Sequence, residues 1–210
     1  MSIVRASAKG DLAQVKKLLA EGADINSADL KGRTALIEAA WGGYTEIVKL
    51  LVESGADIDC ADSSGFTPLM RAVEDEHVAV VTCLLQKGAN VNTRGNVRGS
   101  TPLMLAAENG SVKLIELLLK HGAKINALDQ FEETALARAY RMEQLGAVNL
   151  LESKGATRKP DRNHYTHADK DLRAVTKATL PKWSAEAEDT GLDDDEPAEV
   201  IEEAFEEEEQ

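Results

Sequence analysis

Four histidines are the side chains of this sequence best suited to acid–base catalysis or metal binding. His164 and His167 stand three positions apart, so on a helix they would share one face and could bind a metal ion. No cysteine accompanies them, which argues against a zinc site. His121 precedes Gly122 at an expected helix end, where its side chain suits the free carbonyl groups. His77 is expected in a turn with a local hydrogen bond, so none of the four predicts a catalytic centre.

The two cysteines do not indicate chemistry either. Cys60 and Cys83 fit no metal-binding spacing, and a disulfide between them is not expected. Cys83 lies in an apolar run and is interpreted as a core residue, and Cys60 as a small filler. The sequence also lacks a phosphate-binding loop, a Gly-x-Ser-x-Gly motif and a Gly-x-Gly-x-x-Gly motif. We therefore predict that the protein is not an enzyme and that it needs no cofactor and no metal.

Two short sequence markers recur with one period along most of the chain. Gly-Ala dipeptides begin at Gly22, Gly55, Gly88, Gly122 and Gly155, and Thr-x-Leu begins at Thr34, Thr67, Thr101 and Thr134. Successive markers are 33 or 34 residues apart. Unrelated markers that keep one period indicate a stack of structural repeats.

Each repeat has the sequence signals of two helices and a loop. Thr67-Pro68 and Thr101-Pro102 place a hydroxyl at the N-cap and proline at the first helical position. Gly43 is expected to turn the chain between the helices, and Gly55 to close the second one. The apolar stripe of the second helix needs a neighbouring repeat to cover it, which is why such units stack.

The repeating pattern resembles that of the ankyrin-repeat family, most closely over Gly32–Gly65 and Gly99–Asp129. This resemblance implies an all-α fold, an ankyrin-repeat α-solenoid of helix pairs joined by β-turn fingers. It covers about residues 1–160. We place the five repeats at about 1–31, 32–65, 66–98, 99–132 and 133–160, with one extra residue in the third finger. Glu76 stands where other repeats have a turn glycine.

The charge of the chain is concentrated at its C-terminal end. The formal net charge is −13, but residues 184–210 contain 14 acidic residues and no lysine or arginine. The rest of the chain has 23 of the 37 acidic residues and all 24 basic ones, so it is nearly neutral. Neither part offers a basic face for nucleic acid. No run of about 18 apolar residues predicts a membrane span, and no apolar signal region opens the sequence. We therefore expect a cytoplasmic protein.

Two segments follow the repeats. Residues 161–183 are expected to form a linker, in which Thr166 could cap a short helix. Residues 184–210 form an acidic tail with few apolar side chains, and such a composition predicts disorder. Val200, Ile201 and Phe205 are the exception, because on a helix they would share one face and could fold against a partner.

The resemblance also implies where a partner binds. Ankyrin repeats bind other proteins with the finger tips and the exposed face of the first helices, which line a concave groove. Carried over by position, the partner-binding residues are Leu30, Lys31, Arg33, Trp41, Phe66, Glu74, Asp75, Val97, Arg98, Glu108, Phe131 and Arg141. Trp41 is either an anchor of the interface or a residue that packs over a neighbouring finger.

We predict a non-catalytic protein–protein interaction module that binds an unidentified partner and is a monomer on its own. One alternative is an escort or regulator of a basic protein that uses the acidic tail, and another is a secreted effector aimed at a host cell. A further hypothesis has the tail fold back on the groove, because Lys31, Arg33 and Arg98 suit acidic groups.

Overall fold

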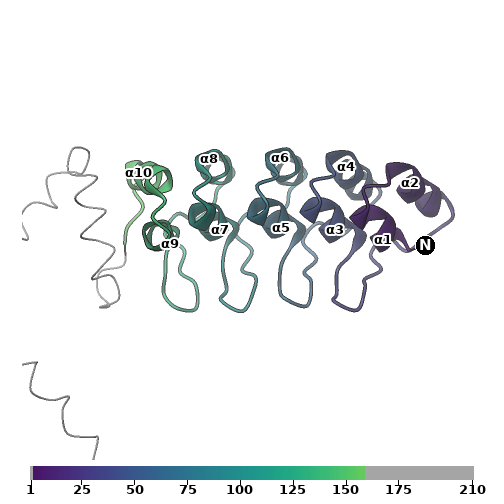
Figure 1. The fold of residues 1–210 in the computed structure, drawn as a ribbon, viewed down its shortest axis with the longest axis horizontal. Helices are drawn as coiled ribbons and strands as arrows, with labels where there is room; N and C mark the ends of the chain where they lie inside the picture. The colour runs from purple at the N-terminus through teal and green to yellow at the C-terminus, as the bar shows by residue number, and fades with distance from the viewer. Residues whose placement is uncertain (1, 159–210) are drawn as a thin grey trace, which may run out of the picture. The chain divides into compact units, whose positions relative to one another are not determined.

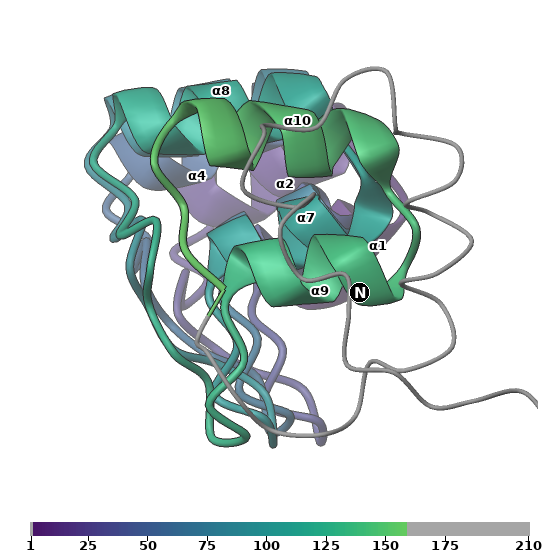
Figure 2. The same cartoon turned by 90° about the vertical axis from the view of Figure 1, so that its left-hand side faces the viewer.

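The computed structural model describes residues 2–158, which form ten α-helices in five consecutive pairs. The first helices of the pairs lie in one layer: α1 (Ile3–Ala8), α3 (Ala35–Trp41), α5 (Pro68–Glu74), α7 (Pro102–Asn109) and α9 (Ala135–Arg141). The second helices form the other layer: α2 (Leu12–Ala20), α4 (Thr45–Glu53), α6 (Val78–Gln86), α8 (Val112–Lys120) and α10 (Leu145–Ser153). Figures 1 and 2 show the two layers.

Each first helix packs against its own second helix and against the first helix of the next pair. The prediction of an all-α solenoid of stacked helix pairs is therefore confirmed for this part of the chain. Several sequence predictions lie outside the described residues: the helix in 161–183, the histidines His164 and His167, and the tail 184–210 with Val200, Ile201 and Phe205.

The helices begin where the sequence predicts. The side chains of Thr34, Thr67, Thr101 and Thr134 each accept a hydrogen bond from the backbone N–H three residues ahead. Pro68 and Pro102 occupy the first turns of α5 and α7, so both predicted Thr-Pro caps are confirmed. The turn prediction also holds, because Glu76 takes the left-handed conformation (φ 57°) that Gly43 takes in the preceding pair (φ 72°).

The apolar core runs between the two layers. Ala39 and Ala40 of α3 are fully buried, and their small side chains let α1 and α5 approach closely on either side. Ile47, Val48 and Leu51 of α4 are buried as the predicted stripe requires, while Leu50 lies partly exposed at its edge. Burial of this kind stabilises the fold by about 1.5–3 kcal/mol per large side chain.

Loops that we call fingers project from the first-helix layer, away from the second helices (Figures 1 and 2). Neighbouring fingers are joined by backbone hydrogen bonds, in which the N–H groups of Ser63, Asn96 and Gln130 donate to the carbonyls of Lys31, Gly65 and Arg98. We number the fingers by residues: finger one is 29–33, finger two 62–66, finger three 95–100 and finger four 129–133.

Finger three contains the extra residue predicted from the sequence. In the other fingers, the aspartate at the start donates its N–H to the carbonyl four residues ahead, as Asp62 does to Phe66. In finger three, Gly95 donates to Ser100, five residues ahead, and Asn96 turns with a positive φ of 56°. The additional residue therefore makes finger three longer than its neighbours.

Candidate partner-binding surface

The predicted partner-binding residues lie on the fingers and on the first helices, but they differ in how far solvent reaches them. Leu30, Val97 and Phe131 are the most exposed, with exposed fractions of 106%, 86% and 66%. The other exposed positions are Lys31, Asp75 and Arg98. The remaining six are only partly exposed: Arg33, Trp41, Phe66, Glu74, Glu108 and Arg141.

Trp41 lies close to two guanidinium groups. The Cζ atom of Arg33 is 5.7 Å from the centroid of the Trp41 ring, and that of Arg71 is 4.7 Å from it. Arg71 also lies over the ring of Phe66 at 4.0 Å. These four residues form what we call the Trp41 cluster, in which cation–π contacts hold both aromatic rings. Trp41 is therefore engaged with side chains of its own and the next repeat.

The charges of the Trp41 cluster are already paired. Arg33 bonds to Asp29 at 2.8 Å and to Glu38 at 2.7 Å. Arg71 bonds to Asp62 at 2.6 Å and to Glu74 at 2.9 Å. Arg33 is thus not available as a free cation for an acidic partner.

His77 connects the same two repeats. Its Nε2 donates to the carbonyl oxygen of Trp41 at 2.9 Å. The sequence predicts a local hydrogen bond for this residue, and that detail is wrong, because the acceptor lies in the preceding helix pair, 36 positions away. The ring occupies the space beside Gly43, which has no side chain to exclude it.

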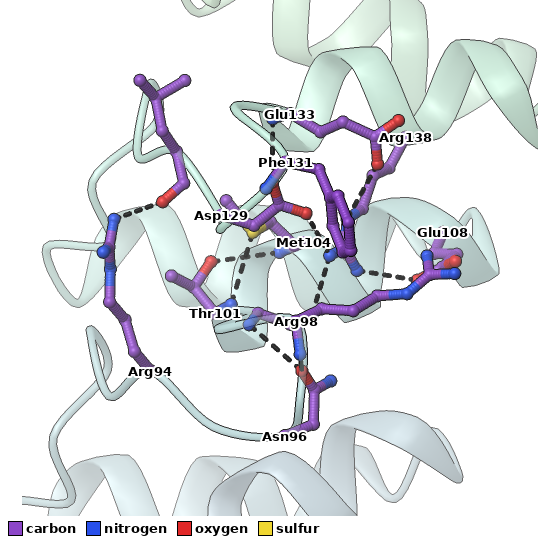
Figure 3. A network of polar contacts seen from close by, with 12 residues as sticks. Arg94, Asn96, Arg98, Thr101, Met104, Glu108, Asp129, Phe131, Glu133 and Arg138 are labelled. Carbon is purple, nitrogen blue, oxygen red and sulfur yellow. Dashed lines mark hydrogen bonds and ion pairs between the residues drawn. The ribbon is translucent and has the colours of Figure 1, made fainter.

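A second cluster, the Arg138 cluster, lies at the C-terminal end of the described stack (Figure 3). Arg138 is 1% exposed and bonds to the fully buried carboxylate of Asp129 at 2.7 Å. It also bonds to Glu108 at 3.0 Å and to the hydroxyl of Ser100 at 2.8 Å. Arg141 extends the cluster by bonding to Glu133 at 2.9 Å and to Glu108 at 3.3 Å. Side chains from two neighbouring repeats thus neutralise one another.

The aspartates that pair with Arg33, Arg71 and Arg138 also fix the conformation of the fingers. One carboxylate oxygen of Asp29, Asp62 and Asp129 accepts two backbone N–H groups of its own finger, at positions two and four residues ahead. The amide oxygen of Asn96 does the same in finger three. Sequence reasoning missed these residues and both Arg71 and Arg138. The signal was present, because the aspartate or asparagine recurs five residues before each Thr-x-Leu marker.

These hydrogen bonds set the acidity of the aspartates. Burial by itself would raise the pKa of Asp129, but hydrogen bonds from Arg138 and from two backbone N–H groups hold that pKa below its ordinary value. The pKa of Asp62 is lowered by the same balance, with Arg71 as the partner. Hydrogen bonds from Arg33 likewise lower the pKa of Asp29.

We therefore expect the protein to lose stability as the pH falls below about 4. A carboxyl group whose pKa is lower in the folded state contributes stability above its unfolded pKa, and that contribution disappears as the pH falls through the folded value. Three aspartates act in this sense, while Glu38, whose pKa is raised by burial, acts in the opposite sense. Urea unfolding between about pH 6 and pH 3 measures the loss. A constant free energy of unfolding over that range would contradict it.

The tips of fingers three and four form an exposed surface, which we call the finger patch: Val97, Arg98 and Phe131. The guanidinium of Arg98 lies over the ring of Phe131, 5.7 Å from its centroid. Arg94, at the base of finger three, donates to the carbonyl of Leu128. Figure 3 shows both arginines beside finger four. This surface combines apolar and cationic groups.

Within residues 2–158, no group of three or more histidine, cysteine, aspartate or glutamate side chains is arranged to bind a metal ion. In the same part of the chain, no helix has the length and apolar character needed to span a membrane.

The chain matches the family model of ankyrin repeats (three copies) over residues 3–95 and again over 92–163. It is also 49% identical over 45 residues to two ankyrin repeat proteins of Rickettsia felis. Each match spans 21% of this chain, and it spans 71% of one relative and 68% of the other.

Proposed function

Because the chain belongs to the ankyrin-repeat family, whose repeats are generally protein–protein interaction modules, we propose that it is a non-catalytic module that binds a partner protein. In this proposal the fingers and the first helices form the binding surface. The binding free energy comes mainly from exposed apolar side chains at the finger tips. The two clusters act as the rigid base that positions those tips.

The observation that carries the proposal is the exposure of Leu30, Val97 and Phe131 on fingers that are otherwise tightly bonded. Exposed apolar side chains on a rigid base favour binding, because little conformational freedom is lost when the partner arrives. The charged side chains beneath them are paired with one another. They therefore fix the shape of the surface and contribute little attraction to a partner.

The test compares two variants of the full chain. Val97→Ser combined with Phe131→Ser removes the apolar part of the finger patch. Val112→Ser is the control, because Val112 is also an exposed apolar residue (39%) but lies on α8 in the other layer. A partner is first isolated with the native chain from an extract of the source organism, and its dissociation constant is then measured by calorimetry.

We expect the finger-patch variant to weaken binding by about 30-fold, as the loss of one interface anchor of about 2 kcal/mol would, and Val112→Ser to change it little. Circular dichroism should show the same helix content in all three proteins. Equal affinity of the native chain and the finger-patch variant would refute the proposal. Loss of binding only after the tail is altered would instead favour an escort of a basic protein.

Trp41→Ala is a poorer test of binding. The Trp41 ring contacts the guanidinium groups of Arg33 and Arg71, which belong to two repeats. Loss of the ring would disturb the junction of these repeats, so lost binding could not be separated from lost structure. The role of Trp41 as an interface anchor stays a prediction.

A further inference from the structure

We propose that the finger tips recognise an extended acidic segment of the partner protein. In this complex, carboxylates of the segment pair with Arg94 and Arg98, and an apolar side chain of the segment packs against Val97 and Phe131. The proposal rests on the proposed function and adds the chemistry of the partner. Three features of the described residues carry it: the charges of the fingers, the apolar groups beside them and the arrangement of the fingers.

Finger three differs from the other fingers in charge. Fingers one, two and four each contain an aspartate that pairs with an arginine, whereas finger three has Asn96 at that position and no acidic residue. Arg98 is exposed, and within residues 2–158 its guanidinium contacts the ring of Phe131 but no carboxylate. Arg94 is exposed too, and its side chain donates to the neutral carbonyl of Leu128. Arg98 therefore offers a planar set of N–H donors that matches a carboxylate.

The acidic side chains of the fingers do little to offset these cations. Most of them are buried or held in salt bridges: Asp29, Asp62, Asp129 and Glu133. Glu132 is the exposed acidic residue of the four fingers. Lys31, at the tip of finger one, is exposed and adds a further cation. The finger tips therefore attract a segment rich in carboxylates and repel one rich in lysine or arginine.

Exposed apolar side chains accompany the cations. Leu30 precedes Lys31 and Val97 precedes Arg98, at equivalent positions of fingers one and three, and Phe131 lies beneath Arg98 on finger four. Apolar groups bordered by charges are typical of protein interaction surfaces. They suit a segment in which apolar residues stand among acidic ones. A nucleic acid would use the cations alone, and the nearly neutral body of the chain gives it no basic face.

The fingers are arranged so that one extended segment can meet several of them. They lie side by side in a row and are joined by backbone hydrogen bonds (Figure 1). Packed helices lie about 8–10 Å apart, so neighbouring fingers repeat at about the same interval. An extended chain rises about 3.3 Å per residue, and about three residues therefore cross from one finger to the next. A segment of about 12 residues is long enough to cross all four fingers.

Selection from a library of random peptides tests the proposal without a known partner. The full chain is immobilised and offered phage that display peptides of about 12 residues, the length that crosses the fingers. The same library is offered to the variant Arg94→Gln with Arg98→Gln. The matched control is Lys113→Gln with Lys120→Gln, which removes two exposed cations from α8 in the other layer. Circular dichroism and urea unfolding check that the three proteins are equally folded.

We expect the native chain and the control to select peptides that combine several aspartates or glutamates with a large apolar residue. The arginine variant should lose this preference for acidic residues. One selected peptide, labelled with a fluorophore, should bind Arg98→Gln about tenfold more weakly than the native chain, as the loss of a charge-assisted hydrogen bond would. Because Arg98 makes no side-chain hydrogen bond within the described residues, this single variant should fold normally. Raising the salt concentration from about 0.05 M to about 0.5 M should also weaken binding.

Several results would overturn the proposal. Selected peptides without an excess of acidic residues would do so, as would an acidic preference that persists in the arginine variant. So would a library from which the native chain selects nothing. A labelled single-stranded DNA that bound more tightly than the selected peptide would also overturn it, because Arg94 and Arg98 would then serve phosphate groups.

Failure of this proposal can be distinguished from failure of the proposed function. A partner whose affinity falls in the Val97→Ser, Phe131→Ser variant but not in Arg98→Gln would be bound through apolar contacts alone. The proposed function would then stand, and recognition of an acidic segment would be refuted. If acidic peptides were selected but no protein were captured from the extract, the recognition chemistry would be supported, and the result would count against the proposed function only.

Discussion

Asp129→Ala is expected to lower the free energy of unfolding by about 3–5 kcal/mol, the usual cost of removing one partner from a buried ion pair. The carboxylate is fully buried and bonds to Arg138 at 2.7 Å. Its loss would also leave the N–H groups of Phe131 and Glu133 without their acceptor. Urea unfolding monitored by circular dichroism measures the change.

Asp62→Ala is the matched control. Asp62 makes the same two backbone bonds in finger two, and its partner Arg71 keeps a second salt bridge to Glu74, as Arg138 keeps one to Glu108. The difference is exposure, because the Arg71 side chain is 12% exposed and that of Arg138 is 1% exposed. Since water can reach Arg71 and compensate for the lost carboxylate, we expect a smaller cost of about 1–3 kcal/mol. If the two variants lost equal stability, burial of the Arg138 pair would not be the cause.

The chain itself contains an alternative to the buried pair. In finger three the aspartate is replaced by Asn96, and the position equivalent to Arg138 is Leu105, which is buried. Asn96 still accepts the two finger N–H groups, and no charge is buried there. Asp129→Asn together with Arg138→Leu should therefore be less destabilising than Asp129→Asn alone, as hydrophobic replacements of buried ion pairs often are.

The fold could be predicted from the sequence because its signals are local and repeated. Thr67-Pro68 starts a helix through atoms within three residues, and the turn at Gly43 needs only its own backbone conformation. The period of 33 or 34 residues then predicts that such units stack. Even the turn at Glu76, which lacks a glycine, could be placed, because the position in the repeat determines the conformation.

The clusters could not be predicted in the same way. Arg138 meets Glu108 and Ser100, which precede it by 30 and 38 residues, and these contacts depend on how two repeats are stacked. The position carried over from the family indicates that Trp41 lies near the surface. It does not indicate that Arg33 and Arg71 lie over the ring from two different repeats. Which finger tips stay free depends on these pairings.

Gly95→Ala is expected to be the other strongly destabilising change, at about 3 kcal/mol, the upper range for forcing extra volume into a packed site. Gly95 is buried in finger three and is not in the left-handed conformation, so its backbone would accept alanine. The obstacle is contact. A Cβ atom would overlap the carbonyl oxygen of Gly65 and lie 2.5 Å from the sulfur of Met70, which is fully buried.

Neither neighbour can easily move away. The carbonyl of Gly65 accepts the N–H of Asn96, which ties finger two to finger three, and Met70 lies in the core of α5. Gly122→Ala is the control, because Gly122 has a φ of 87° and no heavy atom lies within 4 Å of the position that an alanine Cβ would take. That variant should lose only about 1 kcal/mol through backbone strain. Since alanine at position 95 would displace finger three, it should also weaken partner binding through Val97 and Arg98. Equal losses of stability in the two variants would show that finger three tolerates the added carbon.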